Sequence, residues 1–184
     1  MSPLKRLLWE MEGLKFLVRN LRYGGNLKAF DYINRGELIF RGCSFSDLKK
    51  INKLHKHLRD GIGLNIWRKI LYGLIGNRLI SLIAFEDGRT IAFEMFYFKA
   101  DEIPSKTIHE AFIGVHPSYQ RQGLATELRR FSIQKLKSSG YIHGISTNIT
   151  RDNSASFQSA LKVGFEVDDK SSTAEACYLF CELK

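Results

Sequence analysis

The chain has 184 residues, of which 44% are hydrophobic and 26% are charged, and its formal net charge is +9. This size and composition fit one globular domain with a sizeable core. Arg, Lys and Asn interrupt the most apolar stretch, residues 63–85, which excludes an uninterrupted membrane-spanning helix there. The three cysteines form no CxxC pair, so we expect reduced thiols, no metal site and a cytoplasmic protein.

Hydrophobic periodicity, caps and turn residues predict the elements in chain order. We expect helices over 4–22 and 27–33, a strand over 37–42, helices over 46–58 and 65–75, a hairpin over 78–98 that turns at Asp87-Gly88, a strand over 108–115, a helix over 120–138, a strand over 141–150, a helix over 153–163, and strands over 165–169 and 176–183. This order predicts a single mixed α/β (α+β) domain over 1–184, with an antiparallel first half. Residues 1–36 are expected to form a helical N-terminal extension.

Basic residues are concentrated in the first part of the chain. Residues 1–73 hold 15 Lys and Arg against 6 Asp and Glu, whereas residues 74–184 hold 13 of each. This asymmetry fits an anionic partner, such as a nucleic acid, a membrane surface or a phosphorylated small molecule. It fits equally a solvated basic surface that aids solubility.

The stretch VHPSYQRQGLATELRRF, residues 115–131, places a glycine turn between a strand and a helix. The first N–H groups of a helix lack intrahelical partners, and the helix dipole makes that end partly positive. An anion is stabilised there, and Gly123 has no Cβ to keep a phosphate from the backbone. Arg121 can add a charge-assisted contact. The turn therefore predicts either a phosphate cradle or an ordinary helix start, and it is neither a Walker loop nor a GxGxxG fingerprint.

Two motifs in this region resemble those of the GNAT superfamily of N-acyltransferases. IGVHPSYQRQGLA, residues 113–125, resembles the cofactor-binding motif of the superfamily. NSASFQSALKVGF resembles its second motif, with Asn153, Ser156, Gly164 and Phe165 at the matching spacing. The resemblance covers residues 108–165, and the order of the predicted elements from residue 38 to residue 183 agrees with it.

The resemblance implies a mostly antiparallel GNAT-like sheet with a splayed central strand pair, flanked by helices. It implies that acetyl-CoA or another acyl-CoA lies between the splayed strands, with its pyrophosphate on the glycine turn and its pantetheine arm along the strand. The cofactor-binding residues carried over are Ile113, Gly114, Val115, Gln120, Arg121, Gln122, Gly123, Leu124, Ala125, Thr126, Asn153 and Ser156.

Direct attack by an amine, which is usual in the superfamily, needs a neutral amine, a polarised carbonyl and an acid for the leaving thiolate. We expect Glu110 or His109 as the base, and the alternative is an amine that arrives neutral from solution. Many members carry a tyrosine acid seven residues after Asn153, but this chain has Ala160 there. Ser156 or a water is therefore the expected acid, and the missing ring predicts room for an acyl group larger than acetyl.

The resemblance also places the acceptor beside the first helices after residue 37, which are basic. The residues concerned are Arg41, Lys49, Lys50, Lys53, Lys56, Arg59, Arg68 and Lys69, with Trp67, Tyr72, Phe96, Tyr97 and Phe98 as candidates for stacking. Phosphates are attracted to such a surface and cationic acceptors are repelled. We therefore expect an N-acyltransferase for a small-molecule amine, with a nucleotide-linked (dTDP or UDP) amino sugar for surface polysaccharide as the candidate acceptor. The alternatives are a ribosomal or other peptide N-acetyltransferase and a non-catalytic GNAT-fold module that binds CoA or nucleic acid.

The helix over 4–22 combines an apolar stripe with basic residues. These are Lys5, Arg6, Lys15, Arg19 and Arg22. The pattern fits a dimer element, a membrane-surface helix or simple packing on its own domain. We expect a homodimer, no nucleic-acid partner and no membrane span.

Overall fold

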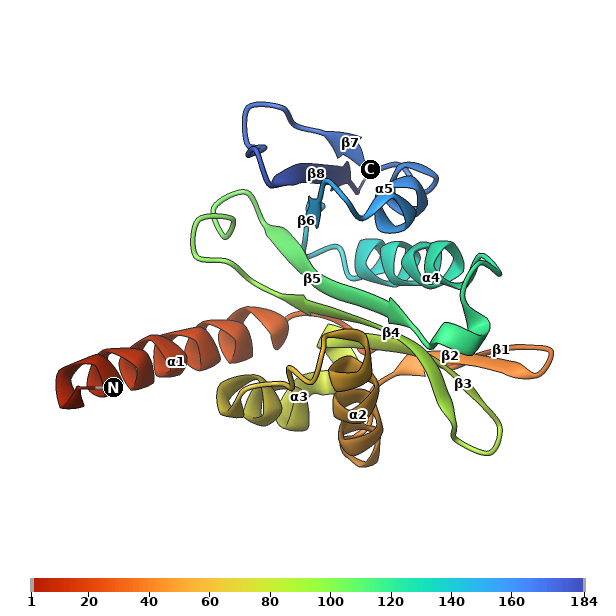
Figure 1. Cartoon of the computed structure of the whole chain (residues 1–184), viewed down its shortest axis with the longest axis horizontal. Helices are drawn as coiled ribbons and strands as arrows, with labels where there is room; N and C mark the ends of the chain where they lie inside the picture. Colours follow the sequence, from red (N-terminus) through yellow and green to blue (C-terminus); the bar gives the residue numbers. More distant parts are fainter. Residues whose placement is uncertain (1, 184) are drawn as a thin grey trace.

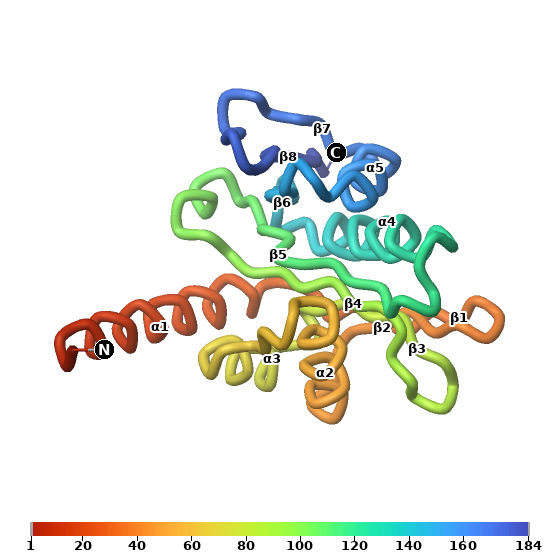
Figure 2. Tube along the Cα trace, in the orientation of Figure 1, coloured from red at the N-terminus to blue at the C-terminus, as the bar shows by residue number. Residues whose placement is uncertain are grey.

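The computed structural model describes residues 2–183. Figures 1 and 2 show a twisted sheet with helices on both sides and one long helix that extends away from it. The helices are α1 (Pro3–Gly24), α2 (Leu48–Leu58), α3 (Ile66–Leu79), α4 (Leu124–Ser138) and α5 (Ser154–Leu161). The strands are β1 (Ile33–Arg35), β2 (Leu38–Gly42), β3 (Ile80–Phe85), β4 (Thr90–Tyr97), β5 (Thr107–Val115), β6 (Gly144–Thr150), β7 (Glu166–Val167) and β8 (Ala176–Glu182).

The strands described in residues 2–183 form one eight-stranded sheet in the order β1-β2-β3-β4-β5-β6-β8-β7. Neighbouring strands pair antiparallel, except β5 and β6, which pair in parallel. A parallel pair needs a crossover, and α4 supplies it. The predicted mixed, mostly antiparallel sheet flanked by helices is therefore confirmed.

The helices cover the two faces of the sheet separately. In Figure 1, α2 and α3 lie on one side and α4 on the other, and α5 packs against α4. Buried apolar side chains from the sheet and from both helical layers form one continuous core, including Leu71 of α3, Phe93 of β4 and Phe131 of α4. Burial on both faces keeps the central strands in fixed positions.

Strand β5 determines where the sheet opens. Residues 107–110 pair with residues 144–147 of β6, and the pairing ends there. The register with β4 shifts at the same place and leaves Ala111 without a partner on that strand. An extra residue of this kind bends a strand and increases its twist. Beyond Glu110, β5 therefore diverges from β6 and pairs with no strand on that side. At the far end of this edge the Val115 carbonyl accepts from Gln120 Nε2 at 3.0 Å.

The prediction of a helix over 27–33 is wrong. Phe30 is buried, its N–H donates to the carbonyl of Asn77 at 2.9 Å, and its carbonyl accepts from Gly42 N at 3.1 Å. These long-range bonds hold the segment extended, and tertiary contacts of this kind override weak local propensity. The chain then forms the hairpin of β1 and β2, which turns at Gly36 with φ +65°.

Two expectations from composition concerned membrane-spanning helices and the cysteines. None of the helices described in residues 2–183 is long and apolar enough to cross a membrane. Cys43, Cys177 and Cys181 are buried free thiols.

Candidate active site

The end of β5, the glycine turn before α4 and helix α5 border a cleft with a volume of about 590 Å³. Its lining includes eleven of the predicted cofactor-binding residues: Ile113, Gly114, Val115, Gln120, Arg121, Gly123, Leu124, Ala125, Thr126, Asn153 and Ser156. Gln122, also predicted, is exposed and does not line the cleft. The structure thus brings together two motifs that lie almost thirty residues apart in the sequence.

The glycine turn differs locally from the prediction, because α4 begins at Leu124 instead of Gln120. Arg121 has φ +61° and Gly123 has φ +81°, so the chain makes a left-handed turn before the helix starts. No side chain caps the helix at Gly123, so the first N–H groups of α4 remain available to a ligand. A Cβ at Gly123 would meet no atom within 4 Å. The space beside this backbone is therefore open to a bulky anion.

Helix α5 forms the opposite wall of the cleft. Its N-cap is Asn153, whose Oδ1 accepts from Ser156 N at 3.1 Å. Lys162 also lines the cleft and adds a positive charge. Ala160, by contrast, is fully buried in the core and is absent from the lining. The extra acyl room expected from the missing tyrosine ring is therefore not found in the cleft.

Glu110 is held in a buried ion pair. Arg129 of α4 donates from Nε and Nη2 to the two carboxylate oxygens at 2.9 and 2.6 Å. The same guanidinium donates to the carbonyl of Ser156 at 2.9 Å and also to the hydroxyl of Ser159. Arg129 thus connects the last paired residue of β5 with α5, across the base of the cleft. Both carboxylate oxygens of Glu110 accept from Arg129, and the residue is 3% exposed, an arrangement that favours a structural role over the expected role as the base.

Electrostatics agree with this geometry. Burial alone would raise the pKa of Glu110, but the charge and hydrogen bonds of Arg129 outweigh it and hold the pKa below its usual value. Burial and the nearby negative charge of Glu110 instead raise the pKa of Glu94 well above its usual value. Glu94 accepts hydrogen bonds from Ser81 and Ser132. This cluster on the α4 side is closed and internally paired.

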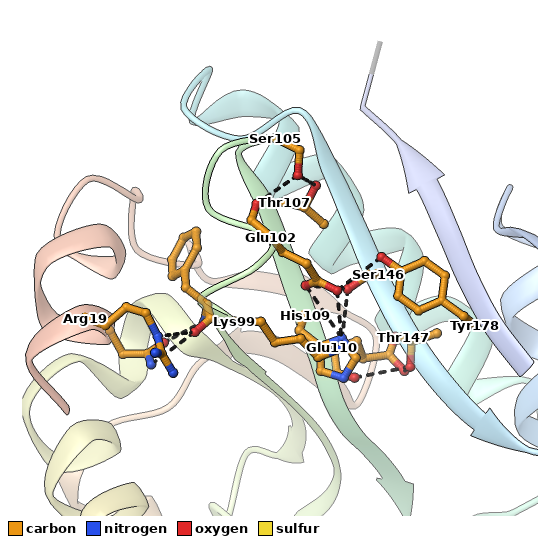
Figure 3. Close-up of polar contacts among 12 residues, drawn as sticks. Arg19, Lys99, Glu102, Ser105, Thr107, His109, Glu110, Ser146, Thr147 and Tyr178 are labelled. Atoms are coloured by element: carbon orange, nitrogen blue, oxygen red, sulfur yellow. Dashed lines mark hydrogen bonds and ion pairs between the residues drawn. The ribbon is translucent and has the colours of Figure 1, made fainter. Parts of the chain in front are cut away.

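His109 lies on the other face of β5, in a second buried cluster (Figure 3). Its Nδ1 is 2.8 Å from the Ser146 hydroxyl, and that hydroxyl donates to Glu102 Oε2 at 2.8 Å. The other oxygen of Glu102 accepts from Tyr178 at 3.1 Å and from Lys99 Nζ at 3.3 Å. Figure 3 shows these side chains converging from the loop before β5 and from strands β5, β6 and β8.

The hydrogen bonds determine the tautomer of His109. The single hydroxyl proton of Ser146 goes to Glu102, so Nδ1 of His109 is the donor to Ser146. Nε2 then carries a lone pair. Burial, reinforced by the charge of Lys99, lowers the pKa of His109 to about 3, so the ring is neutral at physiological pH. A neutral imidazole with a free Nε2 can accept a proton.

The expected stacking surface is only partly present. Tyr72, Phe96 and Phe98 are buried in the core and are not available to an acceptor, which corrects that expectation. Tyr97 remains half-buried and packs edge-on against His109, with ring centroids 5.2 Å apart. Arg68 lies over Tyr97 at 5.8 Å.

Of the expected basic residues, Arg41 is neutralised, because it forms an ion pair with Asp47 at 2.6 Å. Arg59, however, lies over Phe112 at 5.9 Å, and Phe112 lines the cleft. Arg59 therefore keeps positive charge beside the cleft, and Arg68 keeps positive charge beside Tyr97 and His109.

Sequence reasoning missed the residues that organise both clusters. Arg129 occurs in an exposed-looking Arg-Arg pair, and only the helical period from Leu124 and Leu128 places it on the inner face. Glu102 and Lys99 lie in a loop without regular periodicity. Tyr178 lies more than sixty residues from His109, and no local signal connects the two.

Comparison with known proteins identifies the family of this chain. A model of the acetyltransferase (GNAT) family matches residues 50–165. No curated protein sequence matches the chain significantly. Solved structures do match: yncA from Salmonella typhimurium with its cofactor acetyl-CoA has a TM-score of 0.66 at 16% identity, covering 80% of this chain and 94% of that one.

Two further structures are similar in fold. The paia N-acetyltransferase from Thermoplasma acidophilum in complex with coenzyme A has a TM-score of 0.61 at 18% identity, covering 79% of this chain and 98% of that one. The ribosomal-protein-S18-alanine N-acetyltransferase from Escherichia coli has a TM-score of 0.59 at 20% identity, covering 80% of this chain and 94% of that one. At these identities the structures show the fold, and the family model covers more than half of the chain. The chain belongs to the GNAT family of acetyltransferases.

Proposed function

We propose that this protein is an acyl-CoA-dependent N-acyltransferase that transfers an acetyl group to a primary amine by direct attack. The observation that carries the proposal is the cleft itself, where the unpaired edge of β5, the glycine turn before α4 and the start of α5 meet. His109 does not line this cleft, but it lies on the same strand, one residue before the pairing of β5 with β6 ends. Its Nδ1 is bonded to Ser146, so Nε2 is the proposed proton acceptor.

The residues of the cleft fit CoA. Solved relatives of this fold bind acetyl-CoA or CoA. Here the N–H groups at the start of α4 hold the pyrophosphate, assisted by Arg121, and Lys162 adds charge to the opposite wall. The unpaired edge of β5, which includes Ile113 and the N–H of Val115, offers the pantetheine amides the hydrogen bonds that a neighbouring strand would make.

His109 accepts the proton that the attacking amine loses. As the C–N bond forms, the acidity of the nitrogen rises, and its proton passes to Nε2 of the imidazole. Ser146 and Glu102 hold the ring in the tautomer that leaves Nε2 free. Because burial and the charge of Lys99 hold the pKa of His109 at about 3, the imidazolium is short-lived and passes its proton to solvent. The C–S bond then breaks, and the thiolate takes one proton. Ser156 is the proposed donor, because its Oγ accepts from Arg129 at 3.1 Å and lines the cleft, which leaves its own proton available. Ser156 regains a proton from solvent as it gives its own to the thiolate, so one proton passes in net from the amine to the sulfur.

For the acceptor we propose an anionic amine, with a nucleotide-linked amino sugar as the candidate. Arg59 and Arg68 support this choice, since both lie on aromatic rings that adjoin the cleft or His109. Arg19 adds a third cation where its Nε donates to the Phe98 carbonyl at 2.9 Å, and Figure 3 shows it on the same side as Lys99. Phosphates are attracted to such a site, and polyamines are repelled.

The first test is release of CoA thiol from acetyl-CoA with three acceptors of different charge. These are a UDP- or dTDP-linked amino sugar, a peptide with a free N-terminal alanine, and spermidine. We expect turnover with the nucleotide-linked amine alone. Turnover with the peptide would replace the acceptor proposal with an N-terminal acetyltransferase, and no turnover with any amine by a protein that binds CoA would favour a non-catalytic module. A series of acyl-CoA lengths should show a preference for acetyl.

The second test isolates the phosphate cradle. Gly123→Val places a side chain in the space proposed for the pyrophosphate, and its matched control is Gly140→Val. Both glycines have positive φ, +81° and +65°, and a Cβ at either meets nothing within 4 Å. Backbone strain is thus similar in the two variants. We expect calorimetric CoA affinity to fall about tenfold or more, which is about 1.4 kcal/mol, in Gly123→Val only. Equal CoA affinities of the two variants would mean that the pyrophosphate does not bind at Gly123.

A further inference from the structure

Helix α1 is apolar on two opposite faces. Ser2 caps it by accepting from Lys5 N, and it continues for 22 residues. At a rise of about 1.5 Å per residue it is about 33 Å long. Figures 1 and 2 show its N-terminal half extending beyond the rest of the molecule. An apolar face of a helix is normally buried against a partner. Only one side of α1 is covered by its own domain.

The docked face is well defined. Gly13 lies so close to Trp67 of α3 that a Cβ would meet the indole within 2.0 Å. Farther along, Phe16 packs on Tyr97, with ring centroids 5.6 Å apart. Asn20 is fully buried, and its Oδ1 accepts from Phe98 N at 2.6 Å. These contacts fix which way the helix faces, so its opposite side points away from the domain.

The opposite side carries a stripe of six large apolar side chains, which we call the outer stripe: Leu4, Leu7, Leu8, Met11, Leu14 and Val18. Each is between 47% and 66% exposed. Five of them, at 4, 7, 11, 14 and 18, alternate in steps of three and four residues. This is the a/d spacing of a coiled-coil seam, which keeps one narrow line of side chains facing a partner helix.

We propose that the outer stripe pairs with the α1 helix of a second copy of this chain, in parallel, to form a homodimer. In the heptad set by Leu4 and Leu7, Glu10 falls at g and Lys15 at e. A parallel pair places each Glu10 opposite Lys15 of the other copy, a favourable charge contact. An antiparallel pair instead brings the two Glu10 carboxylates to the same edge of the seam.

The stripe does not suit a membrane surface as well. Helices that lie on membranes have a wide apolar face bordered by Lys and Arg. Here the apolar line is narrow, and Glu10 and Glu12 lie beside it. An interface of standard size buries about 800 Å² per partner. Six large side chains, each about half exposed on a helix of this length, approach that area, so we expect a reversible dimer.

The experiment is sedimentation equilibrium of the full chain over a wide concentration range. We expect the wild type to be dimeric and Leu7→Glu/Leu14→Glu to be monomeric, with an unchanged helical circular dichroism signal. The matched control is Leu74→Glu on α3, which is 64% exposed but lies outside the outer stripe, and it should remain dimeric. A wild type that is monomeric at every concentration, or a dimer that survives the double substitution, would overturn the proposal.

Cross-linking tests the orientation independently and does not rely on a disruptive substitution. The native cysteines are buried, so Leu7→Cys introduces an accessible thiol at a d position. Parallel pairing predicts rapid disulfide-linked dimers on oxidation, because the two copies of residue 7 face each other. Absence of the cross-link in a protein that sediments as a dimer would contradict the parallel arrangement. A monomer that co-sediments with vesicles of anionic phospholipid would assign the outer stripe to a membrane instead.

Discussion

Two adjacent residues of β5, His109 and Glu110, belong to buried polar clusters that differ in kind. On the α4 face, Glu110 is neutralised by Arg129, whose other donors reach α5. On the opposite face, His109 is neutral and hydrogen-bonded through Ser146 to Glu102. The first cluster has a full charge pair and no free oxygen on Glu110, whereas the second leaves one ring nitrogen free.

The contrast shows how one strand can serve structure and chemistry at consecutive positions. Alternation along a strand sends successive side chains to opposite faces. A buried ion pair resists change, because removing either partner leaves an uncompensated charge. An imidazole that burial holds neutral, with a pKa of about 3, has one ring nitrogen that accepts a proton only briefly. We therefore propose that the Glu110 side maintains the geometry of the cleft and that the His109 side takes part in proton transfer.

Removing Arg129 should have the largest effect on stability. Arg129→Met leaves the buried Glu110 carboxylate unpaired, and breaking a buried pair in this way costs about 3–5 kcal/mol. The measurement is urea unfolding, with Arg130→Met as the matched control, because Arg130 is the next residue of α4 and is exposed. The control should change the unfolding free energy by less than about 0.5 kcal/mol. Similar values for both variants would mean that the ion pair contributes little.

The pH dependence of stability should sharpen the contrast on the His109 side. The pKa of His109 is about 3 in the folded protein, and an unfolded histidine has a pKa of about 6.5. Between these values the unfolded chain binds a proton that the folded protein does not. The unfolding free energy therefore falls as the pH decreases from about 6.5 toward 3. His109 contributes up to about 1.4 kcal/mol of this decrease per pH unit.

His109→Gln should flatten that part of the profile. The measurement is the unfolding free energy from urea titrations at several pH values between about 6.5 and 4. The exposed His57 supplies the control, His57→Gln, which should keep the wild-type slope. An unchanged slope in His109→Gln would show that the imidazole is not held neutral.

The smallest effect is expected from Tyr178. Tyr178→Phe removes one of three donors to Glu102 and leaves Ser146 and Lys99 in place. A single hydrogen bond contributes about 1 kcal/mol to the unfolding free energy. We expect that loss in urea unfolding and less than about a tenfold decrease in kcat. A decrease of two orders of magnitude would make Tyr178 itself a proton donor in the reaction.

The sequence predicted well which residues come together in the cleft, because their signals are local. A glycine turn before a helix and an Asn cap at the next helix are each visible within a few residues, and the structure brings Gly123 and Asn153 to opposite walls of one cleft. The order of strands and helices followed from periodicity for the same reason. The cluster around His109 was largely invisible, because Glu102, Ser146 and Tyr178 come from separate strands and loops and meet only through the sheet register.

Two errors have physical causes of the same type. Residues 27–33 have helical propensity, but the backbone bonds of Phe30 to α3 and β2 hold them extended. Glu110 has the residue type of a general base, but its buried partner Arg129 is nineteen residues away along the chain. In both cases a non-local contact decides the outcome, and no pattern within the segment reports it.

The most direct test compares His109→Gln with Glu110→Gln. For each variant the melting temperature is measured, and kcat is measured with acetyl-CoA and the best amine acceptor. We predict that His109→Gln keeps a near wild-type melting temperature and loses about 10²–10⁴-fold in kcat, the usual contribution of a positioned base. Glu110→Gln should lower the melting temperature clearly and retain most of kcat per folded molecule. Loss of kcat in Glu110→Gln at an unchanged melting temperature, with His109→Gln still active, would contradict this prediction.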